Sequence, residues 1–210
     1  MKIILLCAPG AGKGTQAEIL SKRFDIPTIS TGNILRAAIK EGTPLGQEVK
    51  HFMDEGSLVP DEIILRIMEE RLKESDCQKG FILDGVPRTI AQAEAMEKDG
   101  VDIDTVLSLE VSDEEIESRM TGRRVCLACG ATYHTEIKAP KKAGVCDNCG
   151  GEIVQRVDDT REKVLNRLAI FHAQTQPLKE FYGARGLLKI VQNRSTIEEN
   201  TANILRALGL

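Results

Sequence analysis

Short apolar segments alternate along the chain with longer segments in which apolar residues recur at helical spacing. The short segments are rich in Ile, Leu and Val, and their length and composition predict buried strands. They comprise residues 2–7, 27–30, 80–83, 105–111 and 187–191. One longer segment, 61–75, carries Ile63, Ile64 and Ile67 on one face and predicts an amphipathic helix. This alternation predicts an α/β protein, a five-stranded parallel sheet with helices on both faces.

Polar residues mark where several helices begin. Ser112 with Glu115, and Thr196 with Glu199, have the spacing of a capping box. A further helix is predicted over residues 161–181. Ligands of such parallel sheets bind at the carboxyl ends of the strands, so candidate site residues are sought there.

Two segments interrupt the alternation. Residues 30–59 hold two short helices that end at Gly42 and Gly56, with no strand between them. Residues 122–159 carry four of the six cysteines and many glycines, without a helical period. Each is predicted to be an insertion into one core domain. That core would comprise residues 1–29, 60–121 and 160–210.

Composition and charge reduce the number of function classes that fit this chain. The chain has 210 residues, of which 41% are hydrophobic and 29% charged, as in an ordinary soluble globular protein. Its net charge of −4 argues against general nucleic-acid binding, which needs a basic face. An anionic ligand would therefore have to be bound by locally gathered Arg and Lys side chains.

The compartment is predicted from the first segment and the cysteines. The apolar run 2–7 is short and lacks a cleavage site behind it, so it predicts a buried strand rather than a signal peptide. No other segment approaches the length of a membrane span. We expect a cytoplasmic protein without membrane partners, in which cysteines bind metal or stay free thiols.

A phosphate-binding loop follows the first predicted strand. Its small residues allow several backbone N–H groups to point at phosphate oxygens, and the next helix adds the positive end of its dipole. Lys13 would supply a mobile charge for the transferring phosphoryl group. The predicted phosphate-binding residues are Gly10, Ala11, Gly12, Lys13, Gly14 and Thr15.

Two positions depart from the general pattern of this loop. Gly14 stands where Ser or Thr is usual, and Cys7 stands where the first Gly is usual. A Cys with positive φ would be strained by roughly 1–3 kcal/mol. We therefore predict that Cys7 keeps an extended backbone, with its sulfur in the core and away from phosphate.

Four motifs beyond this loop resemble those of adenylate kinases, specifically the bacterial type with a long lid. They are 30–36 (STGNILR), 58–61 (LVPD), 81–89 (FILDGVPRT) and 122–124 (GRR). The resemblance covers residues 1 to about 195 and implies the P-loop nucleoside monophosphate kinase fold. It further implies that 30–59 bind AMP and that 122–159 form the lid. The implied activity is Mg²⁺-dependent, reversible phosphoryl transfer from ATP to AMP, giving two ADP, by a monomer.

The resemblance also implies roles for individual residues. The AMP site would comprise Thr31, Arg36, Ser57, Leu58, Val59, Gly85, Val86, Pro87, Arg88, Gln92, Arg156 and Arg167. The ATP site would add Arg119, Arg123, Thr132, Tyr133 and Ser195 to the loop. The catalytic residues would be Lys13, Asp84, Arg88, Arg123, Arg156 and Arg167. Fixed guanidiniums suit this chemistry, because phosphoryl transfer needs positioning and charge neutralisation. Asp84 is suited to orient water around Mg²⁺.

Several of these residues have a second, structural interpretation. Arg119 could pair with Glu115 four residues earlier on a solvated helix face. Gln92 lies three residues after Thr89, so its amide could complete a capping box instead of binding adenine. Asp158 and Asp159 could cap the helix that follows them, or orient lid arginines as the family resemblance implies. Asn33 replaces an Asp that is usual in the family, and it is left out of the site.

Two Cys-x-x-Cys pairs predict a metal site in the lid. The ligands would be Cys126, Cys129, Cys146 and Cys149. Four thiolates suit tetrahedral Zn²⁺ and leave no open position, so the zinc would be structural and His134 would not be a ligand. Two disulfides are the alternative. Cys7 and Cys77 are expected to be buried thiols.

Two other functions compete with the adenylate kinase interpretation. A UMP or CMP kinase would share the phosphate loop, although the long lid and Thr31 favour AMP. A zinc ribbon that binds nucleic acid would need stacking aromatics and more basic residues than 125–155 contain.

Overall fold

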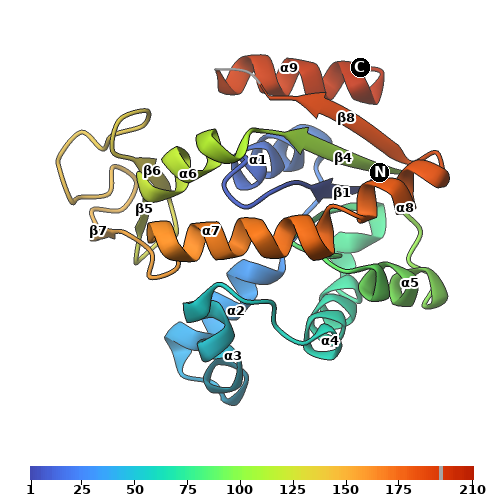
Figure 1. The fold of residues 1–210 in the computed structure, drawn as a ribbon, viewed down its shortest axis with the longest axis horizontal. Coiled ribbons are helices and arrows are strands. Elements are labelled where there is room, and N and C mark those ends of the chain that lie inside the picture. The colour runs from blue at the N-terminus through green and yellow to red at the C-terminus, as the bar shows by residue number, and fades with distance from the viewer. Residues whose placement is uncertain (194–195) are drawn as a thin grey trace.

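The computed structural model of this protein describes residues 1–193 and 196–210. Its main sheet has five parallel strands in the order β2-β3-β1-β4-β8. They are β1 (Lys2–Leu6), β2 (Thr28–Ser30), β3 (Phe81–Asp84), β4 (Thr105–Glu110) and β8 (Leu188–Gln192). Figure 1 labels β1, β4 and β8 of this sheet. The five predicted strands are confirmed to within one or two residues at each end. Because β1 lies in the middle and all strands are parallel, the loop after β1 is at the centre of the edge where all five strands end.

Helices cover both faces of this sheet, as the sequence predicts. They are α1 (Lys13–Phe24), α4 (Asp61–Leu72), α5 (Ile90–Lys98), α6 (Asp113–Thr121), α7 (Arg161–Ile170), α8 (Leu178–Ala184) and α9 (Ile197–Leu208). A short 3₁₀ helix, η1 (Ser75–Lys79), precedes β3. Alternate residues of β1 point to opposite faces. Ile3 and Leu5 belong to the core beneath α1 and α9, whereas Ile4 and Leu6 belong to the core beneath α4, α5 and α8.

The two predicted insertions project from this core at the strand-end edge (Figure 1). The first holds α2 (Thr31–Glu41) and α3 (Pro44–Glu55), which end at Gly42 and Gly56 in the left-handed conformation, as predicted. The second holds an antiparallel sheet of three strands in the order β6-β5-β7. These strands are β5 (Arg123–Cys126), β6 (Thr132–His134) and β7 (Ile153–Val154). A small cluster around Cys126, Tyr133, Cys146 and Ile153 is its own core.

The prediction of a single helix over 161–181 is wrong. The segment is divided into α7, a π-helical turn η2 (Phe171–Thr175) and α8. Pro177 lacks the N–H that a continuing helix needs, and the wide turn directs Thr175 inward. The Thr175 hydroxyl donates to the Arg88 carbonyl at 2.8 Å and is 6% exposed. Wide turns of this kind are frequent at functional sites.

The two predicted capping boxes differ in outcome. Thr196 and Glu199 form the complete box. Ser112 accepts from the backbone N–H of Glu115, but the Glu115 carboxylate pairs with Arg119 instead of closing the box. Within the described part of the chain, no helix has both the length and the apolar character needed to cross a bilayer.

Candidate active site

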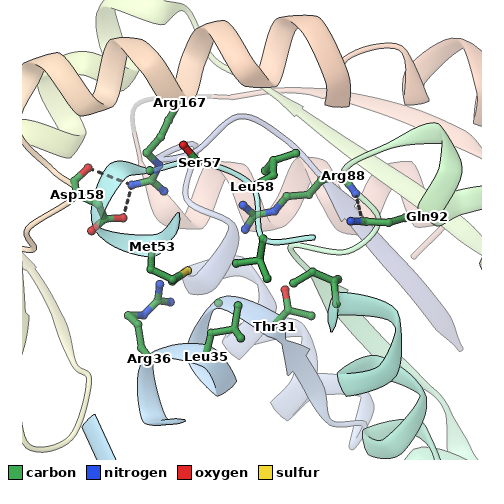
Figure 2. Close-up of a pocket in the computed structure, with 14 residues that line it drawn as sticks. Thr31, Leu35, Arg36, Met53, Ser57, Leu58, Arg88, Gln92, Asp158 and Arg167 are labelled. Carbon is green, nitrogen blue, oxygen red and sulfur yellow. Dashed lines mark hydrogen bonds and ion pairs between the residues drawn. The ribbon is translucent and has the colours of Figure 1, made fainter. Parts of the chain in front are cut away.

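A cleft of about 940 Å³ lies between the core and the two insertions. The phosphate loop, the strand-end residues Asp84 and Gly85 and the first β-strands of the lid line it. A smaller side pocket, shown in Figure 2, opens between α2, α3 and the loop after β3. Arg36, Arg88 and Arg167 line both spaces. The side pocket and the cleft therefore adjoin each other, and these three guanidiniums line the boundary between them.

The phosphate loop has the backbone that its sequence predicts. Gly10 and Gly12 have φ values of 84° and 94°, which a side chain rarely adopts. A Cβ on Gly10 would lie 2.5 Å from Met120 of α6, so this position also needs glycine for space. Lys13 donates to the carbonyls of Cys7 and Ala8 at 3.1 and 3.0 Å, which fixes its ammonium within the loop. The loop can thus present both backbone N–H groups and a cation to phosphate.

Cys7 is buried and without positive φ, as predicted, and it is also among the residues that line the cleft. It is absent from the positive-φ residues of the described chain and is 7% exposed, in the core beneath α1 and α9. Burial raises the pKa of its thiol to about 11, against a smaller opposing effect of Lys13. The thiol is therefore neutral at physiological pH, and it is a packing group.

Besides Arg119, five arginines from distant parts of the chain line the cleft. They are Arg36, Arg88, Arg123, Arg156 and Arg167. Burial lowers the pKa of Arg88 and of Arg167, and neighbouring arginines lower both further. Burial, together with Arg123 and Arg36, lowers the pKa of Arg156 to about 9. The shared cause is that several cations lie side by side away from water.

The Arg156 guanidinium lacks a complete set of partners. Its Nε is buried and makes no hydrogen bond to any residue that the structure describes. A buried donor of this kind is costly unless a ligand satisfies it. An anion in the cleft would supply both the missing acceptor and the missing negative charge.

Two aspartates orient part of this cluster rather than cap a helix. Asp159 is fully buried and accepts from Arg123 Nε at 2.7 Å, and Asp158 accepts from Arg167 at 2.6 Å. The N-cap of α7 is Thr160, which makes no side-chain capping bond. The aspartates therefore hold Arg123 and Arg167 in place, in agreement with the role that the family resemblance implies. Arg36 is held differently, by the Asn33 side-chain oxygen at 2.6 Å.

Eight of the residues predicted to bind AMP line the side pocket (Figure 2). They are Thr31, Arg36, Ser57, Leu58, Val59, Arg88, Gln92 and Arg167. Gly85, Pro87 and Arg156 line the adjoining cleft instead. Val86 is the exception, since it is 1% exposed, packs in the core and lines neither space. Gly85 has φ 87°, and a Cβ there would meet the Arg88 guanidinium at 2.9 Å.

The residues predicted to bind ATP line the cleft, where the structure describes them. These are the six loop residues, Arg119, Arg123, Thr132 and Tyr133. The Tyr133 hydroxyl is turned into the lid, where it accepts from the Asp147 N–H at 2.8 Å and contacts Cys146 Sγ. Ser195 lies outside the described residues. Arg119 pairs with Glu115 while lining the cleft, so both interpretations of Arg119 find support.

The four lid cysteines form the site that their spacing predicts. Their sulfurs all lie within 4.8 Å of one another. Cys126 and Cys149 are 3.5 Å apart and Cys129 and Cys146 3.6 Å, so none of these sulfurs is joined in a disulfide. Tetrahedral zinc with Zn–S bonds of about 2.3 Å needs sulfurs about 3.8 Å apart. The thiolate set fits a zinc ion, and His134 is not part of it.

Some lining residues were not predicted. Leu35, Met53 and Ile64 form the apolar wall of the side pocket. The sequence pattern could have identified two of them, because Leu35 and Met53 lie on the apolar faces of two short helices that needed a packing partner. Thr175 had no comparable signal, since only the π turn brings it to Arg88.

The parallel sheet, the phosphate loop and the arginine-lined cleft define a phosphate-binding-loop protein for anionic nucleotides. The adenylate kinase family model matches residues 5–187. A curated adenylate kinase of Caldicellulosiruptor bescii is 56% identical, with all of both chains covered. Those of Carboxydothermus hydrogenoformans and a Geobacillus species are 54% and 52% identical, with 99% or more of each chain covered. The chain belongs to the adenylate kinase family.

Proposed function

We propose that this protein is an adenylate kinase that transfers the terminal phosphoryl group of ATP to AMP, reversibly, and gives two ADP. The observation that carries this proposal is the arginine cluster between the phosphate loop and the side pocket. Arg36, Arg88 and Arg167 line both the cleft and the side pocket, and Arg123 and Arg156 line the cleft beside them. These guanidiniums, with the Arg156 Nε lacking an acceptor among the described residues, suit a reaction between two anionic phosphates.

The side chains then have separable tasks. Lys13 and the loop N–H groups bind the phosphates of ATP, while Arg36, Arg88 and Arg167 bind the phosphate of AMP. Arg123 and Arg156 neutralise charge on the group in transfer. Little covalent chemistry is needed, because phosphoryl transfer depends on positioning and electrostatic stabilisation.

Magnesium and zinc would have different roles. Asp84 lines the cleft and accepts from Ser30 Oγ at 3.0 Å, which places a hard oxygen ligand beside the phosphate loop. Mg²⁺ prefers such ligands and keeps most of its waters, and it would neutralise phosphate charge. Zinc on the four thiolates would be structural, since it has no open coordination position.

These roles assign a function to each of the three parts of the chain. Residues 1–29, 60–121 and 160–210 would be the core, 30–59 the AMP-binding insertion and 122–159 the zinc-binding lid. Arg123 and Arg156 lie at the two ends of the lid, so lid closure would bring them to the phosphates and exclude water.

One chain supplies every residue named here, which supports a monomer. Free thiols and nucleotide substrates support the cytoplasm.

A coupled assay with AMP, CMP, UMP and GMP as acceptors tests the proposal. With ATP and Mg²⁺, AMP should be the preferred acceptor. Lys13→Ala and Arg88→Ala should each lower kcat/KM by at least ~10²-fold, the scale of a lost transition-state charge contact. Equal activity on CMP and AMP would overturn the substrate assignment.

A further inference from the structure

A closed ring of hydrogen bonds around Asp61 joins the start of α4 to the start of α5. Asp61 Oδ1 accepts from Gln92 Nε2 at 2.6 Å, and Asp61 Oδ2 accepts from Thr89 Oγ1 at 2.8 Å. Thr89 Oγ1 accepts in turn from the Gln92 backbone N–H at 3.1 Å. On the other side, the Gln92 amide oxygen accepts from the Arg88 backbone N–H at 2.7 Å, the contact drawn in Figure 2.

This ring decides which way the Gln92 amide faces. A carboxylate can only accept and a backbone N–H can only donate. A reversed amide would place its oxygen against Asp61 and its NH₂ group against the Arg88 N–H. Gln92 is 1% exposed, so water cannot replace the two bonds that reversal would break. The chain therefore locks the amide in one orientation.

The locked amide offers a ligand in the side pocket one fixed arrangement of hydrogen-bond donor and acceptor. Gln92 lines the side pocket, and its oxygen has a second lone pair while its nitrogen has a second hydrogen. A 6-amino purine offers an amino donor beside a ring-nitrogen acceptor, which complements this pattern at both positions. A 6-oxo purine offers a carbonyl acceptor beside a ring N–H donor, which opposes it at both positions.

We propose that Asp61 is a specificity-determining residue that makes the side pocket select 6-amino over 6-oxo purine monophosphates. The inference rests on the proposed function, since it takes the side pocket as the acceptor site. Asp61 is not among the described residues that line the pocket. It acts through Gln92 as a positioning residue.

Asp61→Asn tests this with little change of shape. An Asn can present either its oxygen or its NH₂ group to Gln92, so a reversed Gln92 keeps this bond and loses only the one from the Arg88 N–H. The ratio of kcat/KM for AMP to kcat/KM for IMP should fall by at least about tenfold, because accommodating a 6-oxo base then breaks one buried hydrogen bond instead of two. The KM for ATP should stay unchanged. Glu62→Gln is the matched control, since it removes one exposed charge from the same first turn of α4.

The outcomes separate the two proposals. An unchanged AMP to IMP ratio in a folded Asp61→Asn variant, or an equal loss on both nucleotides, would overturn the role of Asp61. If Asp61→Asn does not fold, Asp61→Ser, whose hydroxyl can donate as well as accept, must lower the ratio in the same direction. A wild-type enzyme that does not phosphorylate AMP would instead refute the proposed function. Melting temperatures are measured first, so that every comparison uses folded protein.

Discussion

Single residues in this protein serve either binding or stability, and Arg156 shows the conflict between the two. Its guanidinium is half-buried beside Arg123 and Arg36, and its Nε has no acceptor among the described residues. The lowered pKa means that the folded chain without ligand disfavours the charged form, although at pH 7 the group still carries its proton. The site is thus poised for an anion at a cost in stability.

Replacing Arg156 by Gln should therefore stabilise the ligand-free protein while it impairs the enzyme. We expect the melting temperature at pH 7 to rise by about 2–4 °C, the shift that about 1 kcal/mol gives in a chain of this size. We expect kcat/KM to fall by at least ~10²-fold. Arg124→Gln is the control, because Arg124 already donates to the Thr121 and Arg123 carbonyls. A lower melting temperature for Arg156→Gln alone would contradict this account.

The Cys7 thiol should resist alkylation until the pH is unusually high. Burial raises its pKa from 9.0 to about 11, so at pH 8 the thiolate fraction is lower by about 100-fold than in the unfolded chain. The extra stability of the neutral thiol is complete below pH 9 and is lost as the pH rises through 11. Iodoacetamide labelling, followed by mass spectrometry of the Cys7 peptide, measures this in native and urea-unfolded protein. Equal rates at pH 8 would place the sulfur outside the core.

At the scale of elements, we expect the structure of the lid to depend on its metal more than any other part does. Its interior is only the small cluster of Cys126, Tyr133, Cys146 and Ile153, two of which are the expected zinc ligands. So small a core cannot offset the entropy of ordering the segment. Structural zinc contributes roughly 10–16 kcal/mol in small peptides, which is ample for this purpose.

Removal of zinc by a chelator should lower the melting temperature and leave turnover measurable in the cold. The reason is that a zinc ion on the four thiolates would order the lid and have no open position for substrate. Calorimetry and the coupled assay on the same chelated sample measure both effects. Complete loss of activity at a temperature where the zinc-free protein is still folded would show that the metal takes part in the chemistry.

Elements of this fold were predictable where the signal is local. The loop after β1, the caps at Gly42 and Gly56 and the paired cysteines are each contained in a few consecutive residues. The break at 171–175 was not, because Pro177 is tolerated near many helix starts and nothing local shows that Thr175 turns toward Arg88. The Asp61–Gln92 contact likewise joins side chains from two different helices, so it emerges only from packing.

For the whole molecule, the insertion and the lid meet directly across the cleft. Lys40 of α2 donates to the carbonyl of Leu127, which lies between two of the zinc-ligand cysteines, at 2.9 Å. The contact joins the first insertion, 30–59, to the second, 122–159. If the two parts close over substrates, as proposed, this hydrogen bond would couple their closure.

Loss of this contact should weaken the closed form. We expect Lys40→Met to raise the Kd of a bisubstrate mimic, two adenosines joined by five phosphates, by about two- to tenfold, the worth of one exposed hydrogen bond. Lys50→Met in α3 is the control, since Lys50 pairs only locally with Asp54. Titration calorimetry gives the Kd values. Equal affinity of both variants would show that the two parts close independently.

The lid has a hydrophobic core separate from that of the main sheet, and this affects how such enzymes can diversify. The lid packs its own cluster, holds its own candidate metal site and is covalently continuous with the core at its two ends, with the Lys40–Leu127 hydrogen bond as a further contact. Recombination between relatives can therefore exchange this segment as a unit, without repacking the main sheet. The crossover points would have to keep Arg123 and Asp159 together, because that buried pair spans both ends. Thermal tolerance and metal dependence could then be inherited with the lid, separately from the chemistry of the core.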